Sequence, residues 1–111
     1  MTKKNISISG SVEFTRFYKS LGKTNPIKNQ LDEAMDLLKK DPTIGNRIQT
    51  NLWPKKYMRK YGIINNLYRY RVGSNWRVIY TILGKPDGLV CVILEALDHK
   101  NYDVLFGYKT S

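Results

Sequence analysis

The sequence predicts one α+β domain of 111 residues, with a strand and two helices followed by three antiparallel strands. Apolar residues recur with helical periodicity between residues 12 and 40, which predicts the helices. Aromatic and basic residues alternate between residues 67 and 80, which predicts a β-hairpin. The run from 89 to 97 is almost wholly apolar and predicts a strand buried on both faces, at the centre of the sheet.

The first strand and first helix have clear boundaries in the sequence. Ile6–Ser9 alternates apolar and polar residues, as a short strand does. Ser11 can cap a helix over Val12–Leu21, and Gly22 is a typical stop after it. The apolar stripe of this helix consists of Phe14, Phe17, Tyr18 and Leu21.

The second helix begins with Asn25-Pro26, because asparagine is a good N-cap and proline is a good first helical residue. Asp41-Pro42 ends it. Its apolar stripe contains Ile27, Leu31, Ala34, Met35 and Leu38. The two helices therefore form an αα-hairpin that shares one apolar side.

The stretch between the helices and the hairpin is less regular. We expect Thr43–Leu52 to be a loop, and Pro54 to start a short helix over Lys55–Tyr61 that Gly62 stops. Four basic residues lie on this short helix, namely Lys55, Lys56, Arg59 and Lys60. Its two tyrosines could pack inward or stack on nucleic-acid bases.

The hairpin brings arginines together. A three-residue turn over residues 73–75 pairs Val72 with Trp76 and sets Arg71 opposite Arg77. Like charges in that position destabilise the sheet. We therefore expect an anion between them.

Positive charge is concentrated in the middle of the chain. The net charge is +10, and residues 43–86 contain nine basic residues and none of the nine acidic ones. Tryptophan and tyrosine residues are interspersed with this charge. This pattern is typical of a surface that binds nucleic acid or another polyphosphate. An acidic protein partner or simple solubility are the alternatives.

Cysteine content, apolar run length and one glutamate bear on disulfides, membrane insertion and core packing. Cys91 is the only cysteine, so no internal disulfide can form, and its apolar surroundings predict a buried, inert thiol. No apolar run is long enough to span a membrane, and a reducing cytoplasm fits the composition. Glu95 interrupts the central strand and needs a partner, for which an arginine of the hairpin is a candidate.

Element order and motifs resemble the RelE/ParE toxin superfamily, in particular its RelE-type mRNA interferases. The motifs that carry the resemblance are Tyr68-Arg69-Tyr70-Arg71-Val72, Trp76-Arg77-Val78-Ile79-Tyr80 and His99-Lys100-Asn101-Tyr102. The resemblance covers nearly the whole chain in element order, and about the last 45 residues in motif. It implies a compact domain with a curved sheet, two helices on one face and an RNA-binding concave face opposite.

The resemblance also implies a function. RelE-type members are toxins of toxin–antitoxin pairs, and they cleave mRNA in the ribosomal A site without a metal. A ribose 2′-hydroxyl attacks the adjacent phosphate. The implied partners are mRNA on the ribosome and a cognate antitoxin, and no cofactor is expected.

Matched by position, the resemblance implies a catalytic set of Arg69, Arg71, Arg77, His99 and Tyr102, with Tyr108 as a rival for the tyrosine. Arginine forks suit the phosphate oxygens. His99, the only histidine, can transfer protons near neutral pH; if it acts as an acid, Asp98 or Asp103 could be its carboxylate partner. The segment before the hairpin is more basic than a minimal toxin needs, so Lys55, Lys56, Arg59 and Lys60 are predicted to bind RNA.

Two alternative functions remain. A ParE-type toxin shares the fold but acts on DNA gyrase, and such toxins generally lack the basic catalytic set. A protein with this fold could also hold RNA or an antitoxin without cleaving anything.

Overall fold

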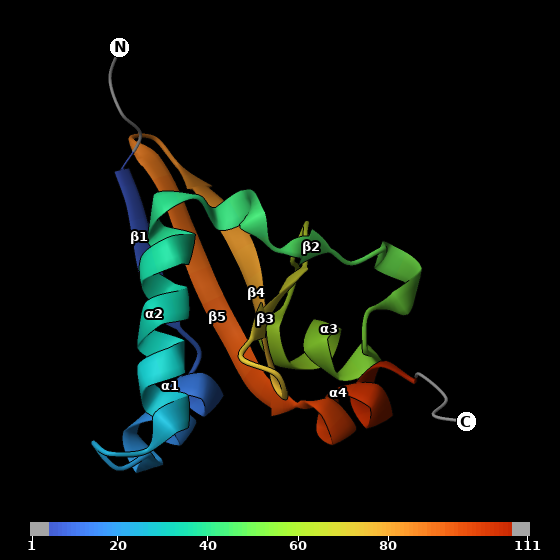
Figure 1. The fold of residues 1–111 in the computed structure, drawn as a ribbon. Coiled ribbons are helices and arrows are strands. Elements are labelled where there is room, and N and C mark those ends of the chain that lie inside the picture. Colours follow the sequence, from blue (N-terminus) through green and yellow to red (C-terminus); the bar gives the residue numbers. More distant parts are fainter. Residues whose placement is uncertain (1–4, 108–111) are drawn as a thin grey trace.

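The computed structural model describes residues 5–107, which form a five-stranded sheet with helices on both faces (Figure 1). The order of strands across the sheet is β1-β5-β4-β3-β2. The strands are β1 Asn5–Gly10, β2 Asn46–Arg47, β3 Tyr68–Val72, β4 Trp76–Lys85 and β5 Gly88–Asp98. The helices are α1 Val12–Ser20, α2 Pro26–Lys40, α3 Lys55–Tyr61 and α4 His99–Phe106, with short 3₁₀ turns at Pro42–Ile44 and Thr50–Leu52.

The middle strand of the five is β4, and β5, which the sequence predicts at the centre, lies next to it in the interior of the sheet. Strand β5 pairs in parallel with β1 on one side and antiparallel with β4 on the other. A crossover through α1 and α2 is needed between β1 and the rest of the sheet, because parallel neighbours cannot be joined by a tight turn. The α+β class and the predicted order of strand, two helices and antiparallel strands are confirmed.

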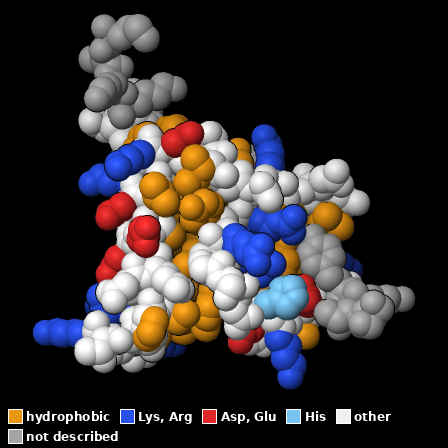
Figure 2. All heavy atoms as spheres, in the orientation of Figure 1, with side chains coloured by type: hydrophobic (Ala, Val, Ile, Leu, Met, Phe, Trp, Pro, Cys, Tyr) orange, Lys and Arg blue, Asp and Glu red, His pale blue; other side chains and the backbone are white. Residues whose placement is uncertain are grey.

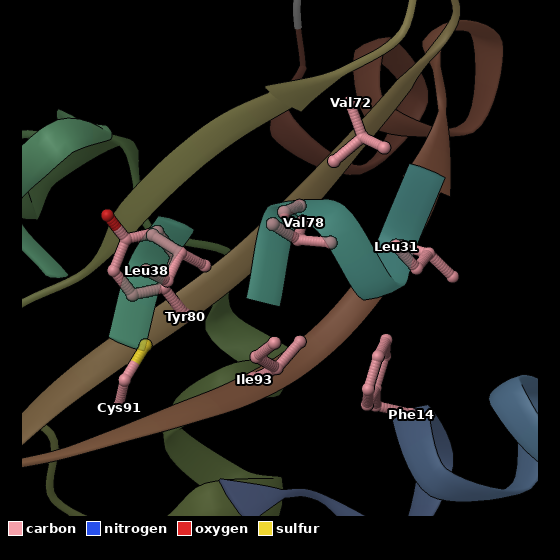
Figure 3. Close-up of a cluster of buried hydrophobic side chains, with 9 residues drawn as sticks. Phe14, Leu31, Leu38, Val72, Val78, Tyr80, Cys91 and Ile93 are labelled. Atoms are coloured by element: carbon pink, nitrogen blue, oxygen red, sulfur yellow. The ribbon is translucent and has the colours of Figure 1, made fainter. Parts of the chain in front are cut away.

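The two N-terminal helices begin where the sequence predicts. The Ser11 side chain accepts a hydrogen bond from the Phe14 amide, and the Asn25 side chain accepts one from the Ile27 amide. Each cap satisfies an amide that the first helical turn leaves unpaired. The helices pack on one face of the sheet over a core of Phe14, Leu31, Ala34, Leu38, Val72, Val78, Tyr80, Cys91 and Ile93 (Figure 3).

A second core lies on the opposite face, under α3 and α4. It consists of Ile48, Tyr57, Ile64, Leu67, Ile79, Leu94, Tyr102 and Phe106. The sequence predicts the short helix α3, but after the apolar strand it indicates only a turn or a short helix, where the structure has α4. The family resemblance implied helices on one face only. The face opposite α1 and α2 is thus partly covered by α3 and α4.

The loop expected over Thr43–Leu52 is only partly correct. It contains β2, which pairs with β3 and extends the sheet by one edge strand. Two residues are too few to produce a visible alternation of side chains. The Tyr80 hydroxyl fixes the approach to β2, because it donates to the Pro42 carbonyl at 2.7 Å and accepts from the Gly45 amide at 3.1 Å.

The partner expected for Glu95 was wrong. Its carboxylate accepts hydrogen bonds from the Tyr57 hydroxyl at 2.6 Å and from Lys56 Nζ at 3.1 Å, both on α3 rather than on the hairpin. Glu95 pairs with Ile79, which also pairs with Arg69, so its side chain lies on the same face of the sheet as the arginines, where α3 reaches it. A β-bulge follows at once, because Tyr80 pairs with Ile93 and one residue of β5 is skipped.

The described helices include none that is both long and apolar enough to cross a membrane.

Candidate active site

The β3–β4 hairpin places three arginines on one face of the sheet. Arg71 lies opposite Arg77, and Arg69 lies opposite Ile79, in the register that the sequence predicts. Gly73 opens the turn with a φ of 61°, a left-handed conformation that glycine adopts without strain. The alternating tyrosines and valines point to the other face and join the first core.

A cleft of about 280 Å³ opens over these arginines. Its lining consists of Asn46, Arg69, Arg71, Arg77, Tyr102 and Asp103, contributed by β2, β3, β4 and α4. Figure 2 shows a group of Lys and Arg side chains right of centre, with the histidine and an acidic side chain beside it. Three guanidinium groups around one small cleft create a strongly positive local potential.

Tyr102 forms the floor beneath two of the arginines. Its buried ring stacks on Phe106 with centroids 4.6 Å apart. The guanidinium carbons of Arg77 and Arg69 lie 5.1 Å and 5.7 Å from the ring centroid, within the range of cation–π attraction. Arg69 Nη1 also donates a 2.5 Å hydrogen bond to the Tyr102 hydroxyl. The ring therefore holds both guanidinium groups toward the cleft.

One nitrogen of the Arg77 guanidinium group has no acceptor in the described part of the chain. This atom, Nη1, is buried. Leaving a buried donor unpaired costs about 1–3 kcal/mol, and more for a charged group. An anion in the cleft would supply the missing acceptor.

His99 lies at the edge of this cleft, at the first position of α4. Its backbone amide donates to the Asn75 carbonyl of the hairpin turn at 2.7 Å, which fastens the start of α4 to the sheet. Its Nε2 lies 3.2 Å from Oδ2 of Asp103. The other candidate carboxylate, Asp98, instead caps α4 by accepting from the Asn101 amide. Asp103 is thus the acid that faces the imidazole.

The fold has a counterpart among solved structures. The YoeB/ParE toxin from Agrobacterium tumefaciens superposes with a TM-score of 0.60 over 84% of this chain and 98% of that chain, at 11% sequence identity. The protein has the RelE/ParE toxin fold. Neither a protein-family model nor a curated protein matches the sequence. Because the identity is so low, the roles of individual residues rest on the geometry of this chain.

Within the RelE/ParE toxin fold, the structure brings together four of the five predicted catalytic residues. Arg69, Arg71, Arg77 and Tyr102 line the same cleft, and His99 reaches it through Asp103. Tyr108, the rival tyrosine, lies outside the described residues.

The basic helix α3 uses two of its four cations inside the protein. Lys56 pairs with Glu95 at 3.1 Å, and Lys60 pairs with Glu13 at 3.2 Å. Lys55 and Arg59 are exposed, and neither forms an ion pair within the described chain. Tyr57 packs in the second core, so it does not stack on bases.

Sequence reasoning missed Asn46 as a residue of the cleft, because the strand that carries it is only two residues long. Asn46 pairs with Arg69 and therefore lies beside it.

The structure also contains no group of three His, Cys, Asp or Glu side chains suited to a metal within residues 5–107.

Proposed function

We propose that this protein is the toxin of a toxin–antitoxin pair and an endoribonuclease that cleaves mRNA in the ribosomal A site. The observation that carries the proposal is the cleft of about 280 Å³, which is lined by three arginines and by Asp103, the partner of His99. The likeness to a YoeB/ParE toxin supports the class of protein.

The arrangement suits phosphoryl transfer from an internal nucleophile. As the ribose 2′ oxygen bonds to phosphorus, the bond to the 5′ oxygen breaks, leaving a 2′,3′-cyclic phosphate and a 5′-hydroxyl. Negative charge grows on the non-bridging oxygens in the transition state. Arg71 and Arg77 stabilise that charge, because guanidinium forks donate parallel hydrogen bonds to phosphate oxygens. Tyr102 holds Arg77 and Arg69 beside this phosphate site.

His99 acts as the acid–base group of this reaction. A neutral imidazole can accept the proton of the 2′-hydroxyl, and an imidazolium can donate a proton to the 5′ oxygen. Since arginines carry the phosphate charge and the histidine the proton, the proposed reaction assigns no step to a metal ion.

The proposed partners are mRNA on the ribosome and a cognate antitoxin. Basic residues on α3 add sequence-independent contacts to the RNA backbone, with Lys55 and Arg59 best placed because they are exposed. Lys56 and Lys60 belong to the same surface, but they contribute less positive potential because each is paired with a glutamate.

Expression in bacterial cells tests the proposal. Wild-type protein should arrest growth, and primer extension on cellular mRNA should reveal cuts spaced by codons. Arg71→Ala and His99→Ala should abolish the cuts. Arg16→Ala removes an exposed arginine of α1, outside the cleft, and should leave them unchanged.

The same experiment separates the alternatives. Growth arrest with intact mRNA and double-stranded DNA breaks would overturn the ribonuclease in favour of a gyrase poison. Normal growth at high expression would favour a binding module without activity.

A further inference from the structure

Asp103 is an acidic residue in a cleft lined by three arginines. Asp103 is only 9% exposed. Among the described residues that line this cleft, it is the one with a carboxylate. A negative charge here repels phosphate and weakens the cleft's attraction for an anion. Its presence therefore calls for a task that offsets this cost.

The contact of Asp103 points to that task. It lies one helical turn after His99 on α4, a spacing that puts the two side chains on the same face of the helix. Asp103 lines the cleft, whereas the histidine side chain is 53% exposed and does not. The carboxylate is thus the link between a largely solvent-exposed imidazole and the arginine cluster.

Within residues 5–107, the hydrogen bond that ties His99 to the sheet is made by its backbone. The His99 amide donates to the Asn75 carbonyl. This bond fixes the position of the backbone but leaves the side-chain torsions free. A half-exposed imidazole with free torsions would sample several rotamers. The contact between Nε2 and Oδ2 of Asp103, at 3.2 Å, selects one of them.

We propose that Asp103 is a positioning residue that holds the imidazole of His99 at the edge of the arginine cleft. With Nε2 bonded to the carboxylate, Nδ1 is the nitrogen left to exchange a proton with the RNA. Asp103 itself does not touch the reacting atoms. This inference rests on the proposed ribonuclease, and its test includes a measurement that does not depend on cleavage.

A double-mutant cycle tests whether Asp103 acts through His99. Ribosomes programmed with a defined mRNA are cleaved under single-turnover conditions by wild type, Asp103→Asn, His99→Ala and the double variant. Asp103→Asn should slow cleavage by about 10-fold or more, since a mispositioned proton donor or acceptor loses most of its contribution. In the His99→Ala background the same change should have no further effect. An equal loss in both backgrounds, or no loss in either, would overturn the proposal.

Asp103→Glu separates positioning from packing. It keeps a carboxylate on a longer side chain, so it should retain clearly more activity than Asp103→Asn, even where both lower the unfolding midpoint equally. Activity that follows the unfolding midpoint across the two variants would reduce Asp103 to a structural residue and contradict the inference.

The sole histidine provides the measurement that is independent of cleavage. Proton–nitrogen correlation spectra of the imidazole ring report on one residue only. Asp103→Asn should shift the Nε2 resonance and increase ring motion, while backbone amide signals outside α4 stay in place. If the ring signals do not respond, the positioning role fails. If they respond but wild type does not cleave mRNA, the positioning stands and the ribonuclease proposal fails.

Discussion

Arg71 and Arg77 face each other across the β3–β4 ladder, an arrangement that two like charges do not favour without a ligand. The buried, unpartnered Nη1 of Arg77 within residues 5–107 sharpens this point, because a guanidinium in that state gains most from an incoming acceptor. At the scale of single residues, the account therefore depends on the arginines being matched to an anion.

The first prediction concerns the shape of Arg77 as well as its charge. Arg77→Ala should lower the rate of mRNA cleavage by about 100-fold or more, in line with the loss of one donor to a transition-state oxyanion. Arg77→Lys should recover only part of the rate, because an ammonium lacks the planar fork. Single-turnover kinetics measure both. Full activity of Arg77→Lys would show that charge alone is needed.

A second prediction separates the ring of Tyr102 from its hydroxyl. Tyr102→Phe keeps the stacking on Phe106 and loses the hydrogen bond from the charged Arg69, so it should cost about 1.5–3 kcal/mol of stability. Tyr102→Ala removes a buried ring and should cost about 3–5 kcal/mol. Urea denaturation gives both values. Equal costs for the two variants would show that the ring does not support the site through its packing.

At the scale of elements, the hairpin shows how much of the site the sequence can predict. Its alternation of aromatic and basic residues is strong enough to give the register, and the structure has the same pairs. The apolar stripes and N-cap residues of α1 and α2 could be predicted equally well from the sequence. These features are local, so the sequence displays them directly.

The remaining parts depend on contacts between distant segments. Glu95 is bonded by Lys56 and Tyr57 of α3, a segment distant in sequence, and no local pattern predicts such a contact. The segment that leads into the strand carrying Asn46 is held by hydrogen bonds between the Tyr80 hydroxyl and the backbone of Pro42 and Gly45. Asp98 and Asp103 were both candidates for the carboxylate partner of His99. The structure uses Asp98 to cap α4, which leaves Asp103 as the partner.

The third prediction tests how α3 is attached. Tyr57 donates a 2.6 Å hydrogen bond to Glu95, whereas Tyr61 donates only longer ones, at 3.3 Å to the Leu94 carbonyl and 3.5 Å to Glu13. Tyr57→Phe should therefore destabilise the protein by about 1.5–3 kcal/mol, the range for a bond to a charged group. Tyr61→Phe, the matched control one turn away, should cost less than about 1 kcal/mol. Equal urea midpoints for the two variants would contradict this attachment.

At the scale of the whole molecule, burial of titratable groups predicts a loss of stability in alkaline solution. Burial raises the pKa of the Cys91 thiol to about 12, and it also raises the pKa of Tyr57 and Tyr80 above the usual value for tyrosine. A raised pKa means that the folded state favours the neutral form. The stability from these groups is complete below their unfolded pKa values and is lost as the pH rises toward the folded ones.

Urea midpoints at several pH values provide the fourth test. They should be nearly constant from pH 7 to about 8.5, and then fall up to pH 11 as the unfolded thiol and phenols ionise. Cys91→Ala should make the start of this fall shallower. A midpoint that stays unchanged to pH 11 would show that these groups are not buried as the structure has them.

The distribution of charge along the chain determines where the folded protein is most positive. The net charge of +10 is concentrated in residues 43–86, which supply the hairpin arginines, β2 and α3. The folded chain gathers part of that charge around one cleft beside its only histidine. Long-range attraction brings such a surface to a polyanion, and under the proposed function the cleft then binds a single phosphate.

Mapping the ends of mRNA on purified ribosomes is the most direct test of that account. Wild-type protein is added to ribosomes with a defined codon in an empty A site, and both new RNA ends are analysed. We predict a single cut in the A-site codon, with a 2′,3′-cyclic phosphate upstream and a 5′-hydroxyl downstream, that is lost in Arg77→Ala and retained in Arg16→Ala. Intact mRNA with the wild-type protein, or a cut that survives in Arg77→Ala, would contradict the account.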